Sequence, residues 1–292
     1  MKRYRVWHRT AYTYSLPVED SVGQFHLAPR DLPWQSVSSS AVTVEPEPED
    51  LSRDTDYFGN ASTYFHVTDP HSALTIESSS DVTVTVPEYD AAALETPWER
   101  ARPLMHPDVA GAWRATEFAI ESPRATHVPD AAAYAAASLT PGRPIGEAAT
   151  DLMQRIFRDF DYDPTATTVT STVADALSKR AGVCQDFAHV ALACLRSHGV
   201  AARYVSGYLA TQPPPGKERV FGADASHAWL AVWLPGTDQW LAIDPTNNQW
   251  ADDRYVTAAW GRDYGDVSPV KGIIFTDAKT STLRVSVDVA PV

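Results

Sequence analysis

The stretch Arg180-Ala181-Gly182-Val183-Cys184-Gln185-Asp186-Phe187-Ala188-His189 places a cysteine two positions after a glycine. Apolar side chains then recur at helical spacing as far as Leu195, so we predict a helix over residues 183–197 that is ended by Gly199. Cys184 is therefore expected in the first turn of this helix.

The chain contains two cysteines, Cys184 and Cys194. On one helix they are about 15 Å apart, which is too far for a disulfide, so two free thiols are expected. Cys194 lies in the apolar stripe and is interpreted as an inert core residue. Cys184 differs, because a helix N-terminus stabilises a thiolate and directs backbone N–H groups toward an oxyanion beside the sulfur. Cys184 is the candidate nucleophile.

A predicted hairpin further along supplies a histidine and an aspartate. Residues 225–234 and 239–244 read as strands, and in both of them His227 and Asp244 point away from the aliphatic face. The register that pairs the central leucines of the two strands also pairs His227 with Asp244, and a shift by two residues keeps them diagonal. A slip by one residue would separate them. His227 is the candidate base and Asp244 the residue that orients its imidazole.

Each of these residues also has a structural interpretation. A single buried cysteine or strand histidine most often serves packing, and an Asp-Pro-Thr sequence usually forms a turn. A zinc site from Cys184, His189 and His227 is a further alternative, but His189 lies on another helix face and no fourth ligand is evident. The helix start and the strand parity together favour a Cys-His-Asp triad, with no metal and no cofactor.

The chain divides into four predicted parts. Residues 1–90 alternate apolar and polar positions between turn signals, which predicts an antiparallel β-sandwich. Residues 91–144 are rich in alanine and proline and are expected to connect and pack on the core. Residues 145–266 form the core, and residues 267–292 are a C-terminal extension with a final strand.

Two predicted helices precede the cysteine helix. The first is amphipathic and covers residues 145–160. The second ends at Arg180 and begins with a capping box of Thr172 and Asp175, and Gly182 is predicted as its left-handed stop.

Charge and hydropathy argue against several partners. The formal net charge of −13 is unfavourable for binding nucleic-acid phosphates. No apolar run approaches the ~18 residues of a membrane span, and residues 1–9 are not followed by the apolar stretch of a signal peptide. With two free thiols, we expect a cytoplasmic protein with no nucleic-acid or membrane partner. The sequence carries no signal of an oligomeric state.

Four motifs resemble the transglutaminase-like superfamily, and in particular its bacterial proteins with an N-terminal β domain, a group named for an assumed cysteine protease activity. The motifs are Gly182 to His189, Ala202 to Tyr208, Ser226 to Trp229 and Asp244 to Asn247. Residues 27–30, 58–60 and 261–270 extend the resemblance over nearly the whole chain.

The resemblance implies an α+β fold, in which the N-terminal β domain precedes a papain-like core of helices packed on an antiparallel sheet. It implies that Cys184 attacks an amide of a peptide or protein through a thioester, with His227 and Asp244 on adjacent strands. Tyr162 is the expected oxyanion donor beside the N–H of Cys184, because no tryptophan precedes the cysteine closely, as one does in the animal enzymes. No calcium-loop pattern occurs, so no metal is expected.

The substrate and the acyl acceptor stay open. Water as acceptor gives a protease or amidase, and an amine gives a transglutaminase-like acyltransferase. The alternatives are a non-catalytic peptide-binding module on the same fold and an arylamine-type N-acetyltransferase. The loop 212–224 is expected to cover the cleft and help to select the substrate. The residues expected to line the cleft are Gln185, Asp186, Tyr204, Tyr208 and Trp229.

Overall fold

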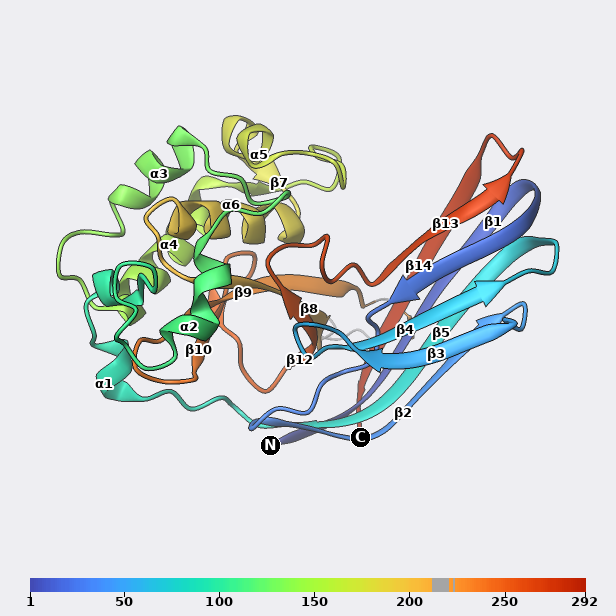
Figure 1. The fold of residues 1–292 in the computed structure, drawn as a ribbon, viewed down its shortest axis with the longest axis horizontal. Coiled ribbons are helices and arrows are strands. Elements are labelled where there is room, and N and C mark those ends of the chain that lie inside the picture. The colour runs from blue at the N-terminus through green and yellow to red at the C-terminus, as the bar shows by residue number, and fades with distance from the viewer. Residues whose placement is uncertain (212–220, 223) are drawn as a thin grey trace, which may run out of the picture.

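The structure is a computed structural model that describes residues 1–211, 221–222 and 224–292. A long curved sheet forms one part of the molecule, and helices packed on a second sheet form the other (Figure 1). The two chain ends lie close together, where β1 begins and β14 ends. This is the α+β fold that the sequence predicts.

The first part is an antiparallel sheet organised around β1. In its first half β1 pairs with β5 and β14. Further along it pairs with β13 from Val18 to Phe25 and with β4 from Ser21 to Phe25. All seven strands therefore belong to one continuous sheet, which is curved along its length (Figure 1). Its strands are β1 (Lys2–Phe25), β2 (Gln35–Glu45), β3 (Asp50–Thr55), β4 (Ala61–Val67), β5 (His71–Val84), β13 (Val270–Thr276) and β14 (Ser281–Pro291).

Apolar side chains fill the space inside this curved sheet. Alternate positions of β1, β4 and β5 point inward, because successive side chains of a strand face opposite sides. The buried residues are Tyr14, Val18, Phe25, Leu27, Val44, Phe65, Val67, Leu74 and Ile76. The final strand β14 returns to this sheet and pairs with residues 4–14 of β1.

The second sheet carries the helical part of the molecule. It is antiparallel, with the order β11-β10-β9-β8-β12. Its strands are β8 (Ala202–Leu209), β9 (Ser226–Trp233), β10 (Trp240–Asp244), β11 (Gln249–Trp250) and β12 (Tyr255–Gly261). Two short parallel strands, β6 (Asp161–Tyr162) and β7 (Ala181–Gly182), form a separate pair.

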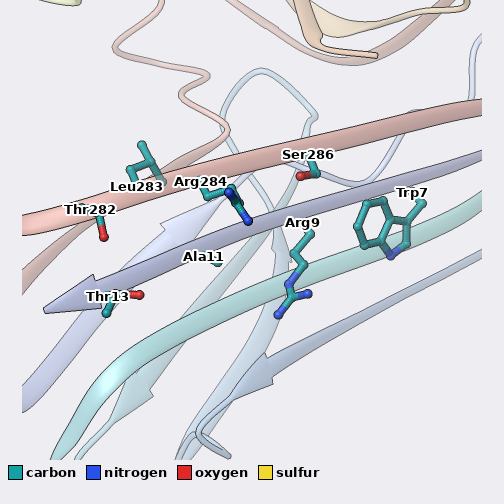
Figure 2. Close-up of a pocket in the computed structure, with 8 residues that line it drawn as sticks. All are labelled: Trp7, Arg9, Ala11, Thr13, Thr282, Leu283, Arg284 and Ser286. Atoms are coloured by element: carbon teal, nitrogen blue, oxygen red, sulfur yellow. The ribbon is translucent and has the colours of Figure 1, made fainter. Parts of the chain in front are cut away.

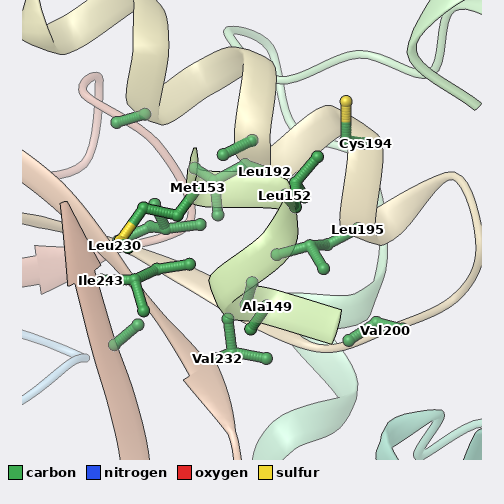
Figure 3. Packing of buried hydrophobic residues seen from close by; sticks show 14 of the residues in the cluster. Ala149, Leu152, Met153, Leu192, Cys194, Leu195, Val200, Leu230, Val232 and Ile243 are labelled. Carbon is green, nitrogen blue, oxygen red and sulfur yellow. The ribbon is translucent and has the colours of Figure 1, made fainter. Parts of the chain in front are cut away.

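Two long helices pack on this sheet, and both were predicted. They are α4 (Ile145–Asp159) and α6 (Cys184–Arg196), and Figure 3 shows their leucines against Leu230, Val232 and Ile243. Burying each large aliphatic side chain contributes about 1.5–3 kcal/mol. The other helices are α1 (Ala91–Leu94), η1 (Trp98–Ala101), α2 (Ala112–Ala115), η2 (Thr116–Ala119), α3 (Pro129–Ala136) and α5 (Val173–Lys179).

The two sheets are joined by apolar packing and by hydrogen bonds from side-chain amides to the backbone. The side chain of Gln35 donates to the carbonyl of Thr257 at 2.8 Å and accepts from its N–H at 2.8 Å. Asn60 makes the same kind of double contact with the backbone of Trp260. The apolar residues at this junction are Tyr4, Val6, Val82, Val84, Tyr208, Ala210, Val256, Ala258, Val287 and Val289.

Two further predictions from the sequence concern the loop 212–224 and the absence of a membrane-spanning helix. Most of the predicted loop 212–224 lies outside the described residues. Within the described residues, no helix combines the length and the apolarity needed to cross a membrane.

Candidate active site

The segment before α6 fixes the position of Cys184. Helix α5 opens with the predicted Thr172–Asp175 capping box and ends at Arg180, which adopts a left-handed conformation with φ 53°. The prediction that Gly182 would be the left-handed stop is wrong, because Gly182 is extended in β7. A glycine is required there for another reason: a Cβ would lie 2.7 Å from Oδ2 of Asp186.

Asp186 holds the first turn of α6 together. Its Oδ2 accepts hydrogen bonds from the backbone N–H of Val183 at 2.9 Å and from the hydroxyl of Thr167 at 2.6 Å. These bonds satisfy a backbone donor at a helix start. Asp186 is buried, so its carboxylate fixes the backbone beside Cys184. Cys184 and Gln185, the first two residues of the helix, are both partly exposed.

His227 and Asp244 lie on the adjacent strands β9 and β10. The hairpin pairs Leu230 with Ile243 and Val232 with Leu241. This register has the predicted parity and is shifted by two residues from the one that pairs Leu230 with Leu241, so Asp244 is diagonal to His227. Nε2 of His227 lies 2.7 Å from Oδ2 of Asp244.

Asp244 is fully buried and well supplied with donors. The hydroxyl of Tyr255 and the amide of Asn247 each donate to Oδ2 at 2.7 Å, and the N–H of Thr246 donates to Oδ1 at 2.8 Å. Burial alone would raise the pKa of this carboxyl group. The hydrogen bond and charge of His227, together with the donors Asn247 and Tyr255, outweigh burial and lower the pKa. Asp244 is therefore a carboxylate at neutral pH.

His227 is influenced by Asp244 on one side and by Cys184 on the other. Burial opposes its charged form, but the hydrogen bond to Asp244 and the charges of Asp244 and Cys184 raise the pKa of His227 to about 10. Since Nε2 is engaged by Asp244, Nδ1 is the nitrogen available to the thiol. The ring of Trp229 stacks on the imidazole, with centroids 5.9 Å apart and planes inclined by 27°.

Two residues of this site were missed by sequence reasoning, Asn247 and Tyr255. Asn247 belongs to the motif that starts at Asp244, and an amide three residues after a carboxylate at a turn is well placed to donate to it. Tyr255 begins β12 and pairs with Leu209 of β8, on the same sheet face as His227. No spacing signal links Tyr255 to the hairpin, because its position depends on the order of strands in the sheet.

The three tyrosines predicted for the site lie in different places. Tyr162 is 59% exposed and pairs with Gly182, and burial of its ring and the neighbouring Cys184 both raise its pKa. Tyr204 is buried, and burial followed by the charge of Cys184 raises its pKa. Tyr208 instead joins the two sheets, and its hydroxyl donates to the carbonyl of Leu27 at 3.0 Å.

The zinc alternative is not supported by the placement of His189. Its Nε2 accepts a hydrogen bond from the N–H of Tyr264 at 3.2 Å, and its ring lies 5.0 Å from that of Tyr204. Burial lowers the pKa of His189 to about 4, so the ring is neutral. Among the residues that the structure describes, no three His, Cys, Asp or Glu side chains gather in a group that could hold a metal ion.

The two cysteines differ as expected. Cys194 is fully buried in the core, and burial raises the pKa of its thiol to about 12. Cys184 is partly exposed at the first turn of α6, next to an imidazole that is held by a buried carboxylate. Of the two thiols, Cys184 is thus the one that solvent can reach.

Comparison with known proteins identifies the family. The model of the bacterial transglutaminase-like N-terminal region matches residues 4–83, and that of the transglutaminase-like superfamily matches residues 132–245. The chain belongs to the transglutaminase-like superfamily. Membership supports a thiol enzyme in general terms.

Relatives of this superfamily member resemble it over almost its whole length. An uncharacterised protein of Mycobacterium tuberculosis is 48% identical over 296 residues, which cover 99% of this chain and 93% of the relative. One of Mycobacterium leprae is 34% identical over 276 residues, which cover 94% of this chain and 93% of the relative. The crystal structure of a Putative Cysteine Protease from Cytophaga hutchinsonii superposes with a TM-score of 0.75 at 19% identity, over 99% of this chain and 90% of that one. The superposition shows the fold.

Proposed function

We propose that this protein transfers acyl groups from amide bonds of a peptide or protein substrate to water or an amine, with Cys184 as nucleophile. The observation that carries the proposal is the placement of one imidazole beside both a buried carboxylate and a thiol. His227 is hydrogen-bonded to the carboxylate of Asp244 at 2.7 Å, and Cys184 lies near enough for its charge to raise the pKa of His227. This combination orients the ring and favours its charged form beside the thiol.

In the first half of the reaction, His227 takes the proton of the Cys184 thiol. The sulfur attacks the carbonyl carbon of the amide and forms a tetrahedral oxyanion. The C–N bond then breaks, and His227 gives its proton to the departing amine. A thioester between the acyl group and Cys184 remains.

In the second half, the acceptor reacts with this thioester. Water or an amine loses a proton to His227 as it attacks the carbonyl carbon, and the C–S bond breaks. The proton on His227 then returns to the thiolate of Cys184. Asp244 stays ionised throughout and stabilises the imidazolium that forms in each half. These steps need no metal and no cofactor.

The oxyanion has two proposed donors. The N–H of Cys184 lies in the first turn of α6, where N–H groups have no intrahelical acceptor. Tyr162 contributes its hydroxyl from β6, since its side chain is exposed and lies near Cys184. Loss of one such donor typically lowers kcat by about 10²–10³-fold.

We further propose that the substrate lies over Gln185, beside the triad, since Trp229 is only 1% exposed and packs behind the ring of His227. Residues 145–266 hold all three proposed catalytic side chains, while residues 1–90 and 267–292 support them from the neighbouring sheet. Two free cysteines are compatible with a reducing compartment, so we place the protein in the cytoplasm.

The proposal is tested by intact-protein mass spectrometry with a peptide library, with and without an added primary amine. We expect a mass increase at Cys184, and the released product distinguishes hydrolysis from transfer to the amine. Cys194→Ala is the matched control and should form the same adduct, whereas Cys184→Ala should form none. A second arm offers acetyl-CoA and an arylamine to test the acetyltransferase alternative.

Two results would contradict this assignment. One is unchanged product formation by Cys184→Ala. The other is faster labelling of Cys194 than of Cys184 by iodoacetamide at neutral pH. Binding of peptide by Cys184→Ala, together with no turnover by the wild type, would indicate the non-catalytic module instead.

A further inference from the structure

A cavity of about 760 Å³ lies between the N-terminal sheet and the second sheet, apart from Cys184, His227 and Asp244. Its volume is typical of small-molecule sites. We propose that it is a second ligand site, which binds a carboxylate attached to an apolar body. The cavity is lined by Leu32, Pro33, Trp34, Thr85, Val86, Glu88, Tyr89, Arg203, Asp238, Gln239, Trp240 and Trp260.

Arg203 is the unusual member of this lining. Its side chain is only 8% exposed, and its Nε is buried with no hydrogen-bond partner among the described residues. Its guanidinium lies 3.6 Å from the ring centroid of Trp260 and 4.6 Å from that of Trp240. In the part of the chain that the structure describes, no carboxylate is paired with it. A buried cation without an anion is unfavourable, and ring contacts do not neutralise its charge.

A second guanidinium increases the local positive charge. Arg30 lies on Trp260 as well, 3.5 Å from the ring centroid, and its charge acts unfavourably on Arg203. Arg30 has protein partners of its own, because it donates to the carbonyl of Phe58 at 3.0 Å and to the side chain of Asn60. Arg203 is therefore the cation of this cluster that is left for an external anion.

The lining also indicates what kind of anion fits. The planar fork of a guanidinium matches a carboxylate, and the aromatic walls favour an apolar body attached to it. The rim carries the exposed carboxylates Glu88 and Asp238, of which Asp238 is paired with Arg114 at 2.7 Å. Negative charge at the rim disfavours a multiply charged anion such as phosphate. A carboxylate with a single negative charge suits both the buried guanidinium of Arg203 and the acidic rim of the cavity.

This site is separate from the thiol. Arg203 pairs with Ala231, whereas His227 pairs with Gly207, four residues further along β8. That spacing corresponds to about 13 Å along the strand. A hollow on the outside of β1 and β14 provides a contrast (Figure 2). It also contains two arginines, Arg9 and Arg284, but both are exposed to solvent, and Arg9 lies 3.9 Å from Glu77.

The test is calorimetric titration of the full chain with 3-phenylpropionate, 3-phenyl-1-propanol and inorganic phosphate. We expect 3-phenylpropionate to bind at least about 10-fold more tightly than the other two probes, because only it combines the carboxylate with the apolar body. Arg203→Met should weaken its binding by at least about 10-fold, and Arg203→Lys by less, because charge is kept but the fork is lost. Arg284→Met is the matched control and should bind like the wild type.

Further variants keep the test decisive if Arg203→Met does not fold. Trp34 is half-buried at the cavity rim, so Trp34→Ala should fold and should also weaken binding. Thermal unfolding gives an independent readout: 3-phenylpropionate should raise the Tm of the wild type and of Arg284→Met, but not that of Trp34→Ala. The proposal is overturned if no binding occurs up to about 10 mM, if the alcohol or phosphate binds as tightly, or if Arg203→Lys and Trp34→Ala both bind like the wild type.

Discussion

Asp244 and Arg203 are two buried charged residues on the same face of the second sheet, with Asp244 at the end of β10 and Arg203 near the start of β8. Asp244 is fully buried and accepts hydrogen bonds from His227, Asn247, Tyr255 and the backbone of Thr246. Arg203 is almost as deeply buried, but its guanidinium lies over the rings of Trp240 and Trp260 and is paired with no carboxylate among the described residues. One charge is balanced inside the protein, whereas the other has no counter-charge among the described residues.

The difference separates two uses of a buried charge. At Asp244 the protein supplies both the counter-charge and the donors, so the imidazole of His227 is held in one orientation before any substrate arrives. At Arg203 the counter-charge is missing from the described chain, which is the condition of a site that awaits a ligand. If the charge of Asp244 is balanced within the protein, changes to the residues around it should impair activity and stability in the ways described next.

The largest effect is expected for Asp244→Asn. The change keeps the volume but removes the charge and favours the wrong tautomer of His227, so kcat/KM for amide turnover should fall by about 10⁴-fold. Asp238→Asn on the same hairpin is the control, because Asp238 is exposed, and it should keep full activity. Steady-state kinetics with any substrate found by mass spectrometry measures both. Equal activity of the two variants would remove Asp244 from the mechanism.

The positions of Cys184, His227 and Asp244 were largely predictable from sequence, because they depend on local sequence patterns. A glycine, a cysteine and a helical apolar stripe predict Cys184 at a helix start, which α6 confirms. The alternation of apolar residues predicts the sheet face of His227 and Asp244, and the strand pairing has that parity. The exact register was not predictable, because two registers of the same parity bury the aliphatic residues equally well.

The remaining features depend on contacts between distant segments. Tyr255 reaches Asp244 only because β12 pairs with β8, and Arg203 meets Trp260 across the same strand pair. The residues around Arg203 predict a strand, but they do not indicate whether a carboxylate pairs with its guanidinium in the fold. Gly182 is a similar case. From sequence alone, a glycine that leaves room for the side chain of Asp186 cannot be distinguished from a glycine that ends a helix.

A second prediction concerns the pH-dependent contribution of His227 to the stability of the protein. The folded-state pKa of His227 is raised to about 10, against about 6.5 in an unfolded chain. Its stabilising contribution is complete below pH ~6.5 and is lost as pH rises toward 10, at about 1.4 kcal/mol per pH unit. Urea unfolding of the wild type and His227→Gln should therefore give free energies of unfolding that converge over this range.

Arg284→Met provides the control for that comparison, because it changes a surface charge on the other sheet and should keep the wild-type slope. Parallel pH curves for the wild type and His227→Gln would show that the imidazole gains nothing from Asp244 and Cys184 in the folded state.

A third prediction concerns Gly207, which lies on β8 directly opposite His227. A Cβ at this position would lie 2.1 Å from the carbonyl oxygen of Val256 and 2.8 Å from the ring of Trp229. Gly207→Ala should therefore destabilise the protein by about 1–3 kcal/mol, through overpacking. Gly142→Ala is the control, since nothing lies within 4 Å of its Cβ position, although its φ of 74° adds about 1 kcal/mol. Chemical denaturation measures both, and equal losses would contradict the predicted contact.

The sharpest test of the balance around Asp244 is Tyr255→Phe, for which the expected loss of activity is much smaller than for Asp244→Asn. The ring keeps its edge contact with Trp229 at 5.2 Å, while the hydroxyl that donates to Asp244 at 2.7 Å is lost. Removal of one such bond to a charged group corresponds to about 1.5–3 kcal/mol, or roughly 10- to 100-fold in kcat/KM. Because that bond lowers the pKa of Asp244, its loss raises this pKa, and the acid limb of the pH–rate profile should move to higher pH. Tyr208→Phe removes a buried hydroxyl that donates to Leu27 instead, so it should leave the acid limb in place. A fall in rate without movement of the acid limb would mean that Tyr255 supports the fold of the site and not the charge on Asp244.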